Sequence, residues 1–157
     1  MNPKAARLRK LALDASVVLK SYLPEEGSAQ AQAIFKDWAL GHVELLAPAL
    51  MPYEVTNALL VALRRGRIDE ARAEEILGEF MRLRIPTQGL AGLEERAWAL
   101  ALEHQRTAYD AAYLALAERE GVPLITGDKR LYNAVKGKLQ WVRWVGDYRS
   151  VAEAEEG

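Results

Sequence analysis

The sequence contains no cysteine, and this absence excludes several classes of site. Disulfide bonds, thiolate metal centres and cysteine nucleophiles all require a thiol. Histidine is also scarce, because only His42 and His104 are present and they lie far apart in the sequence. We expect both histidines to be structural or to lie at the surface. The lack of cysteine fits a reducing cytoplasm, and we expect a cytoplasmic location.

A strong net charge is lacking as well. The 21 lysines and arginines nearly balance the 22 aspartates and glutamates, which gives a formal net charge of −1. No global field therefore draws the protein to nucleic acid or to an anionic membrane, and any site for a polyanion must be local. No stretch approaches the roughly 18 uncharged apolar residues of a membrane span. Asp14 and Lys20 interrupt the apolar run after the basic N-terminus, which argues against a secretory signal.

The chain is long enough for one domain with a substantial core. It has 157 residues, and half of them are hydrophobic. We find no internal repeat, low-complexity block or linker, and so predict a single domain over residues 1–157. Residues 146–157 are expected to form a partly frayed, acidic tail.

Short apolar runs alternate with longer amphipathic segments along the chain. The expected strands lie at residues 11–13, 43–47, 84–87, 122–126 and 141–145. The expected helices lie at residues 16–23, 28–41, 52–65, 68–83, 93–103, 107–120 and 131–135. This alternation predicts an α/β fold with three layers, α/β/α, around a central and mainly parallel sheet.

Four acidic residues lie where these elements meet. Asp14 follows the first expected strand and Asp128 follows the strand at 122–126, whereas Glu54 and Asp110 lie in the first turns of two helices. In folds of this class, ligands bind in the crevice outside the carboxyl ends of the strands. Carboxylates that converge repel one another, so a hard divalent cation is their natural partner. The pattern predicts metal-assisted phosphodiester chemistry.

Each of these acids also has a structural explanation. Asp14 and Asp128 are favourable caps for the helices that follow them. Glu54 interacts favourably with the helix dipole in a first turn. Asp110 has the spacing of a capping box with Thr107. Capping and metal binding are compatible, so both interpretations stay open for each acid.

Other polar residues stand close to these acids in the sequence. Ser16 is placed to hydrogen-bond Asp14 or a metal-bound water, and Asn57 shares a helix face with Glu54. A basic run follows Asp128 and begins with Lys129 and Arg130. It is either a solvated surface or a contact for RNA phosphates beside Asp128.

Four motifs together resemble the PIN domain, and the VapC-type toxins of toxin–antitoxin pairs in particular. They occur in the family's order and over nearly the whole chain: Leu-Asp-Ala-Ser at 13–16, Glu-Val-Thr-Asn-Ala-Leu at 54–59, Tyr-Asp-Ala-Ala-Tyr-Leu-Ala-Leu-Ala at 109–117 and Leu-Ile-Thr-Gly-Asp-Lys-Arg-Leu at 124–131. The motif around Asp110 is the most specific of the four.

The resemblance implies a metal-dependent endoribonuclease in which Asp14, Glu54 and Asp110 bind Mg²⁺ or Mn²⁺. Asp128 would be a fourth acid that assists a metal or a water, and Thr126 would help to hold the cluster. The resemblance further implies an RNA substrate, a homodimer and a cognate antitoxin protein that enters the acidic groove. Cleavage is expected to be hydrolytic, with a metal-activated water and no side-chain nucleophile.

Three other functions compete with this interpretation. A phosphatase with an aspartyl nucleophile would need a second Asp two residues after Asp14, where Ser16 stands instead. A phospho-accepting receiver domain would need an early pair of acids and a lysine near a later strand, for which Lys129 is a poor match. A catalytically weak PIN module that binds RNA or a protein has no reason to keep four clustered acids.

Overall fold

A computed structural model describes residues 9–155 of the chain, and residues 1–8, with part of the basic N-terminal stretch, lie outside it. Five parallel strands form one sheet in the order β3-β2-β1-β4-β5. The strands are β1 (Arg9–Leu13), β2 (Val43–Pro48), β3 (Thr87–Gln88), β4 (Leu124–Thr126) and β5 (Val142–Trp144). Central strand β1 pairs with both β2 and β4, so Ala12 lies between Leu46 and Leu124. The prediction of an α/β fold with a parallel sheet is confirmed.

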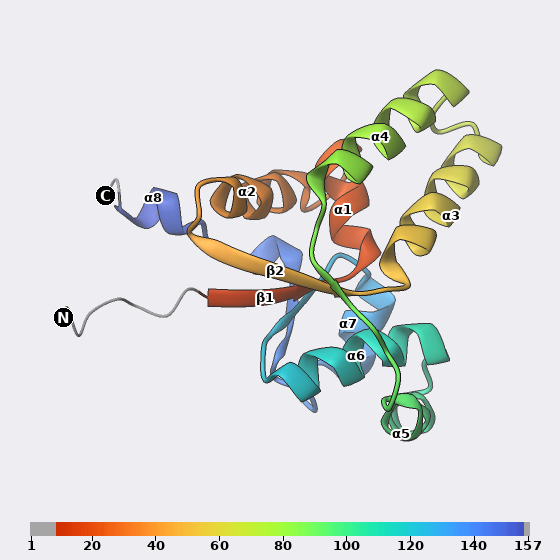
Figure 1. Ribbon diagram of the computed structural model, residues 1–157, viewed down its shortest axis with the longest axis vertical. Helices are drawn as coiled ribbons and strands as arrows, with labels where there is room; N and C mark the ends of the chain where they lie inside the picture. The colour runs from red at the N-terminus through yellow and green to blue at the C-terminus, as the bar shows by residue number, and fades with distance from the viewer. Residues whose placement is uncertain (1–8, 156–157) are drawn as a thin grey trace.

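Helices cover both faces of this sheet. In the described part they are α1 (Ala15–Tyr22), α2 (Ser28–Ala39), α3 (Met51–Arg64), α4 (Glu70–Leu83), α5 (Glu94–His104), α6 (Ala108–Glu120), α7 (Lys129–Val135) and α8 (Val151–Glu155). Helices α1 and α2 lie on one side of β1 and β2, and α6 lies on the other side with α5 packed against it (Figure 1). Among residues 9–155, no helix is long and apolar enough to cross a membrane.

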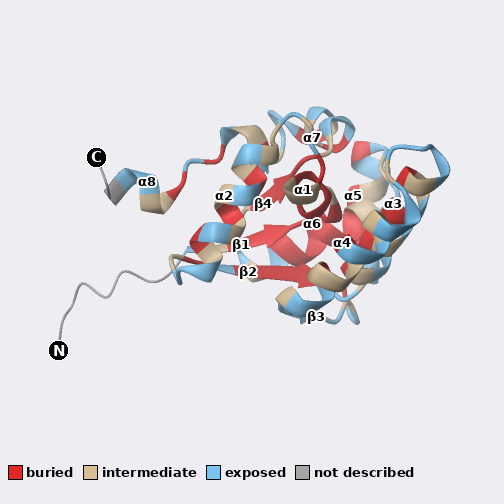
Figure 2. Ribbon diagram, turned by 90° about the horizontal axis from the view of Figure 1, so that it is seen from above, coloured by how far each residue is buried: buried red, intermediate tan, exposed pale blue. Residues whose placement is uncertain are grey.

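The core consists of strands that are buried on both faces and of one nearly enclosed helix. Leu11, Ala12 and Leu13 of β1 are buried, as is every residue of β4. Coverage on both sides explains why these strands are continuous apolar runs without alternation. Helix α6 has seven consecutive buried residues, 111–117, and many of them are alanine, so the helix packs closely beneath the sheet (Figure 2). This packing fixes the start of α6 next to the end of β1.

Two predicted strand boundaries shift because of proline. The strand expected at 84–87 begins only at Thr87, after Pro86, and Arg84 ends α4 in the left-handed region with a φ of 51°. The strand expected at 122–126 begins at Leu124, after Pro123. Proline has no backbone N–H to donate to a ladder, so the paired segment starts after it. The carbonyl groups of both prolines still accept, from Ala47 and Ala12 respectively.

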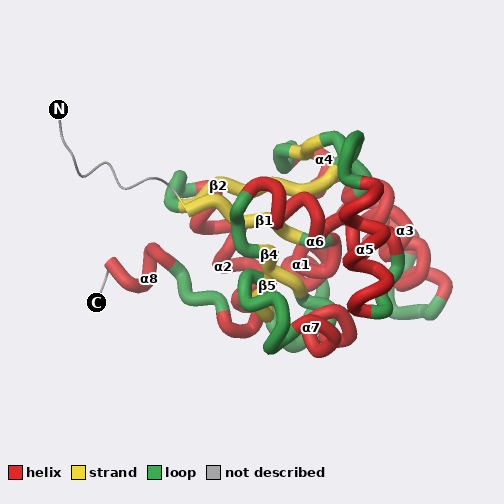
Figure 3. Tube along the Cα trace, turned by 90° about the horizontal axis from the view of Figure 1, so that it is seen from below, coloured by secondary structure: helices red, strands yellow, loops and turns green. Residues whose placement is uncertain are grey.

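The segment after β5 is held against α2 (Figure 3). A 3₁₀ turn (Val145–Asp147) leads into α8. Asp37 of α2 is fully buried and accepts hydrogen bonds from Tyr148 Oη at 2.5 Å, Ser150 Oγ at 2.9 Å and the Val151 backbone N–H at 2.9 Å. Within the tail expected at 146–157, these contacts therefore anchor residues 148–151, whereas residues 156–157 lie outside the described part.

Candidate active site

One pocket of about 430 Å³ is lined by all four predicted acids: Asp14, Glu54, Asp110 and Asp128. It opens where β1 and β4 end, and the first turns of α3 and α6 lie beside the same end of β1 (Figure 1). Ser16 and Asn57 also line the pocket. The structure thus brings together residues that are separated by more than a hundred positions in the sequence, because parallel strands place their carboxyl ends at one edge.

Asp14 is held by hydroxyl groups from both sides. It caps α1 by accepting from the Ser16 backbone N–H at 3.1 Å, and it also accepts from the hydroxyls of Ser16 and Thr126. Thr126 is fully buried, and its hydroxyl oxygen accepts from the backbone N–H of Asp128 at 3.0 Å. The Ser16 hydroxyl oxygen accepts from the Gly127 N–H at 2.8 Å. These bonds join the ends of β1 and β4 and fix the orientation of Asp14.

Burial shifts the pKa of Asp14 strongly. The pKa of this carboxyl is raised to about 6: removal from water raises it most, the bonds from Ser16 and Thr126 lower it, and the negative charge of Asp128 raises it. Its charged form is therefore poorly compensated by the protein alone. A carboxylate in this state favours a proton or a bound cation.

The pKa values of the Glu54 and Asp110 carboxyl groups are raised as well. Burial raises the pKa of Glu54, the nearby Tyr113 hydroxyl lowers it, and the charges of Asp110 and Asp14 raise it again. Burial also raises the pKa of Asp110, against the lowering effect of Arg106, whose Nε lies 3.4 Å from the carboxylate. Asp128 contributes a further raising charge to Asp110. Each of the four acids thus repels at least one of the others across the pocket.

Both Asp110 and Asp128 also take part in the hydrogen bonds of a helix N-cap. Thr107 Oγ1 accepts from the Asp110 backbone N–H at 3.0 Å, and the Asp110 carboxylate lines the pocket beside Arg106. Asp128 caps α7 by accepting from the backbone N–H groups of Arg130 and Leu131 at 2.9 and 3.3 Å. The structural and the functional interpretation of these residues are therefore both compatible with the geometry.

The donor set suits a hard divalent cation, although the carboxylates are spread around the pocket. Within residues 9–155, no three His, Cys, Asp or Glu side chains stand close enough to form a metal cluster. The acids nevertheless face one cavity, repel one another and offer only oxygen ligands, which Mg²⁺ and Mn²⁺ prefer. The buried Tyr113 hydroxyl also lines this pocket, close to Glu54.

The expected RNA contacts Lys129 and Arg130 do not line the pocket. Lys129 Nζ pairs with Glu26 at 3.2 Å, and Arg130 is exposed at the start of α7. The cations that do line the pocket are Lys20, Arg65 and Arg67, none of which the sequence assigns to the site. The signal for Lys20 is its position, since it interrupts the apolar run 17–19 only six residues after Asp14.

Comparison with known proteins agrees with this geometry. The PIN domain profile matches residues 11–137. Ribonuclease VapC3 from Pyrobaculum aerophilum is 40% identical over 125 residues, which cover 78% of this chain and 92% of that protein. Exonuclease VapC9 from the same organism is 35% identical over 123 residues, covering 75% and 88%. The crystal structure of PAE2754 from Pyrobaculum aerophilum superposes with a TM-score of 0.63 at 27% identity, covering 88% of this chain and 92% of that one.

The matched span includes every acid of the pocket as well as Ser16, Asn57 and Thr126. Both the sequence relatives and the superposed structure align with most of their own length, so the similarity concerns the whole domain. The chain therefore belongs to the PIN domain family, as its four motifs predict.

Proposed function

We propose that this protein is a metal-dependent endoribonuclease that hydrolyses phosphodiester bonds of RNA and acts as the toxin of a type II toxin–antitoxin pair. The observation that carries the proposal is the single pocket lined by four mutually repelling, partly buried carboxylates. The similarity of the chain to VapC ribonucleases supports RNA as the substrate.

In this proposal Asp14, Glu54 and Asp110 hold Mg²⁺ or Mn²⁺, and Asp128 assists. A bound divalent ion would supply charge neutralisation for the phosphoryl group and a water of lowered pKa. Ser16 and Thr126 keep the Asp14 carboxylate aimed at the pocket through the hydrogen bonds described above. The Ser16 hydroxyl is engaged with Asp14 and Gly127, which favours water over a serine as the nucleophile.

Cleavage of a mixed pool of structured RNA by the purified protein tests this proposal. The reaction is run with Mg²⁺, with Mn²⁺ and with EDTA, using wild type and the variants Asp14→Ala and Asp110→Asn. Asp69→Asn is the matched control for Asp110→Asn, because Asp69 also begins a helix but does not line the pocket. We expect metal-dependent cleavage that falls at least about 100-fold in both pocket variants and persists in the control.

Cleavage that survives in Asp110→Asn would remove this residue from the site. Metal binding without cleavage of any RNA would favour a catalytically weak PIN module that binds RNA or a protein partner. A covalent protein–RNA adduct trapped during the reaction would rule out direct hydrolysis by water.

A circular RNA substrate distinguishes internal from terminal cleavage. The relatives include proteins named ribonuclease and exonuclease, so the similarity leaves this property open. A closed RNA circle has no end for an exonuclease to attack, and we expect the protein to open it. Digestion of the linear RNA alone would contradict the endonuclease assignment.

We also infer a homodimer and an antitoxin whose segment covers the acidic pocket. The family similarity supports both partners, and co-expression with any small reading frame found beside the gene tests the antitoxin. Light scattering of the purified chain is expected to give the mass of two copies rather than the 17.5 kDa of one.

A further inference from the structure

Lys20 is a buried cation that the mechanism above does not use. It lies near the end of α1, directly after the apolar run 17–19, and only 8% of its surface is exposed. It nevertheless lines the same pocket as the four acids. A lysine is rarely buried to this extent unless its ammonium group has a partner or a task.

Three contacts fix the position of this side chain. Lys20 Nζ donates to Glu25 Oε2 at 3.1 Å and lies 5.7 Å from the centre of the Trp144 ring, where it gains cation–π attraction. Its methylene groups cover Gly127, because a methyl group added there would lie 2.6 Å from Lys20 Cε and 2.7 Å from Cδ. Gly127 thus leaves room for Lys20 directly beside the Ser16 hydroxyl that holds Asp14, and the ammonium group is preorganised near the acids.

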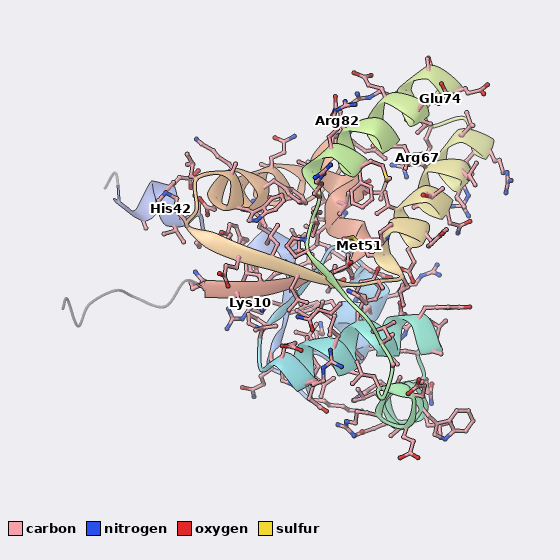
Figure 4. The ribbon with its side chains drawn as sticks, viewed as in Figure 1. Lys10, His42, Met51, Arg67, Glu74 and Arg82 are labelled. Carbon is pink, nitrogen blue, oxygen red and sulfur yellow. The ribbon has the colours of Figure 1, made fainter. Side chains whose placement is uncertain are left out.

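The pocket wall around Lys20 carries a surplus of positive charge. Glu25 is shared between Lys20 and Arg67, whose Nη2 lies 3.6 Å from the other carboxylate oxygen, and Arg65 lines the same wall. Arg67 belongs to the turn between α3 and α4 and lies between these two helices in Figure 4, so this cation comes to the lining from a separate element. Glu25 therefore pairs with two cations, and Arg65 adds a third positive charge to the lining. An ammonium group has three donors, and among the described residues only Glu25 accepts from Lys20.

We propose that Lys20 is a phosphate-contact residue, whose ammonium group binds a non-bridging oxygen of the RNA backbone next to the acidic centre. The proposal rests on the proposed ribonuclease function and names the part of the same pocket that receives the substrate. The whole lining carries three cations and five carboxylates, so a single divalent cation would leave it neutral overall. Its acidic wall then holds the cation and its basic wall holds the RNA.

Binding of a labelled, short single-stranded RNA, measured by fluorescence anisotropy with Ca²⁺ in place of Mg²⁺ at several low concentrations of NaCl, tests this role, and gel analysis of each sample verifies that the RNA stays intact. Lys20→Met keeps the methylene stem against Gly127 and Trp144 but removes the charge. We expect the Kd to rise about tenfold and the slope of log Kd against log salt to fall by about 0.7, as for one lost phosphate contact. Lys36→Met, at an exposed position of α2 outside the pocket, is the matched control and should bind like wild type.

Glu25→Gln distinguishes a phosphate contact from a merely structural ion pair. This variant breaks the same pair but leaves the Lys20 charge in place, so RNA affinity should stay equal or increase, opposite to Lys20→Met. A structural pair would make both variants lose RNA affinity together, in proportion to a loss of thermal stability measured in parallel. That parallel loss, unchanged binding by Lys20→Met, or no RNA binding by wild type would overturn the proposal.

The two proposals fail in distinguishable ways. If wild type cleaves RNA but Lys20→Met binds and cleaves it normally, only the role of Lys20 is refuted. If wild type cleaves no RNA with either metal but the opposite shifts in affinity persist, the phosphate contact stands and the ribonuclease function fails.

Discussion

Asp14 combines the deepest burial among the four acids with the most extensive hydrogen bonding. Its orientation is fixed by Ser16 and Thr126, yet its ionised form lacks a cationic partner among the residues that bond it. Such a residue lowers the stability of the fold, because a poorly solvated charge destabilises it until a cation or a proton arrives.

The variant Asp14→Asn should therefore be more stable than wild type in EDTA at neutral pH. The folded-state pKa of Asp14, about 6, lies above the ordinary 3.8, so the folded protein binds this proton more tightly than the unfolded chain. Wild type then gains stability from this group as the pH falls from above 6 towards 3.8, and the variant does not. We expect a difference of up to about 3 kcal/mol above pH 7 that shrinks towards pH 4.

Urea unfolding of both proteins across this pH range measures the difference. Asp69→Asn, at an exposed helix cap, should keep the wild-type pH dependence and serves as the control. Identical pH dependence for wild type and Asp14→Asn would mean that Asp14 is not strained by burial.

Helix α2 and the segment after β5 depend on one another through Asp37. Burial raises the pKa of this carboxyl, but the hydrogen bonds from Tyr148, Val151 and Ser150 lower it more, so that it ends below its ordinary value. Burial and the bond to Asp37 likewise raise the pKa of the Tyr148 hydroxyl. The charge is thus retained in the core because several donors surround it.

Asp37→Asn should destabilise the protein by roughly 3 kcal/mol at pH 7, since it weakens several bonds to a buried charge. The folded-state pKa lies below 3.8, so the stabilisation is complete above that pH and disappears as the pH falls through the folded value. Wild type and variant should therefore converge below about pH 3.8. Hydrogen exchange at residues 148–152 should speed up in the variant, whereas Asp147→Asn, exposed in the same segment, should leave it unchanged.

Sequence patterns predict the elements well where the information is local. The alternation of apolar runs and helical patterns predicts the strands and helices. The four acids at the ends of strands and the starts of helices predict the pocket, because the strand ends of a parallel sheet converge. Lys20 and Asp37 are different, since their partners Trp144 and Tyr148 lie more than a hundred residues away. Gly127 is a further example: the sequence suggests a sharp turn, but its φ is not positive, and its role is to give space to Lys20.

At the level of the whole molecule, the pocket brings together four carboxylates that repel one another and belong to four different elements. Asp14, Glu54, Asp110 and Asp128 come from the ends of β1 and β4 and from the starts of α3 and α6, so a cation bound among them would hold both layers of helices to the sheet. Any ligand that binds only the folded state stabilises it by mass action. Metal binding should therefore be visible in the stability of the entire domain, without any RNA.

Addition of Mg²⁺ should raise the Tm of wild type. At a concentration about 100 times the Kd, the gain is about 2.7 kcal/mol, which corresponds to roughly 5–10 °C for a domain of this size. NaCl at equal ionic strength controls for screening and should produce a much smaller shift, because it does not coordinate the carboxylates. Asp14→Ala and Asp110→Asn should lose most of the Mg²⁺-dependent shift, while Asp69→Asn should keep it. Equal shifts in all four proteins would place the cation elsewhere and would leave the acidic pocket without its ligand.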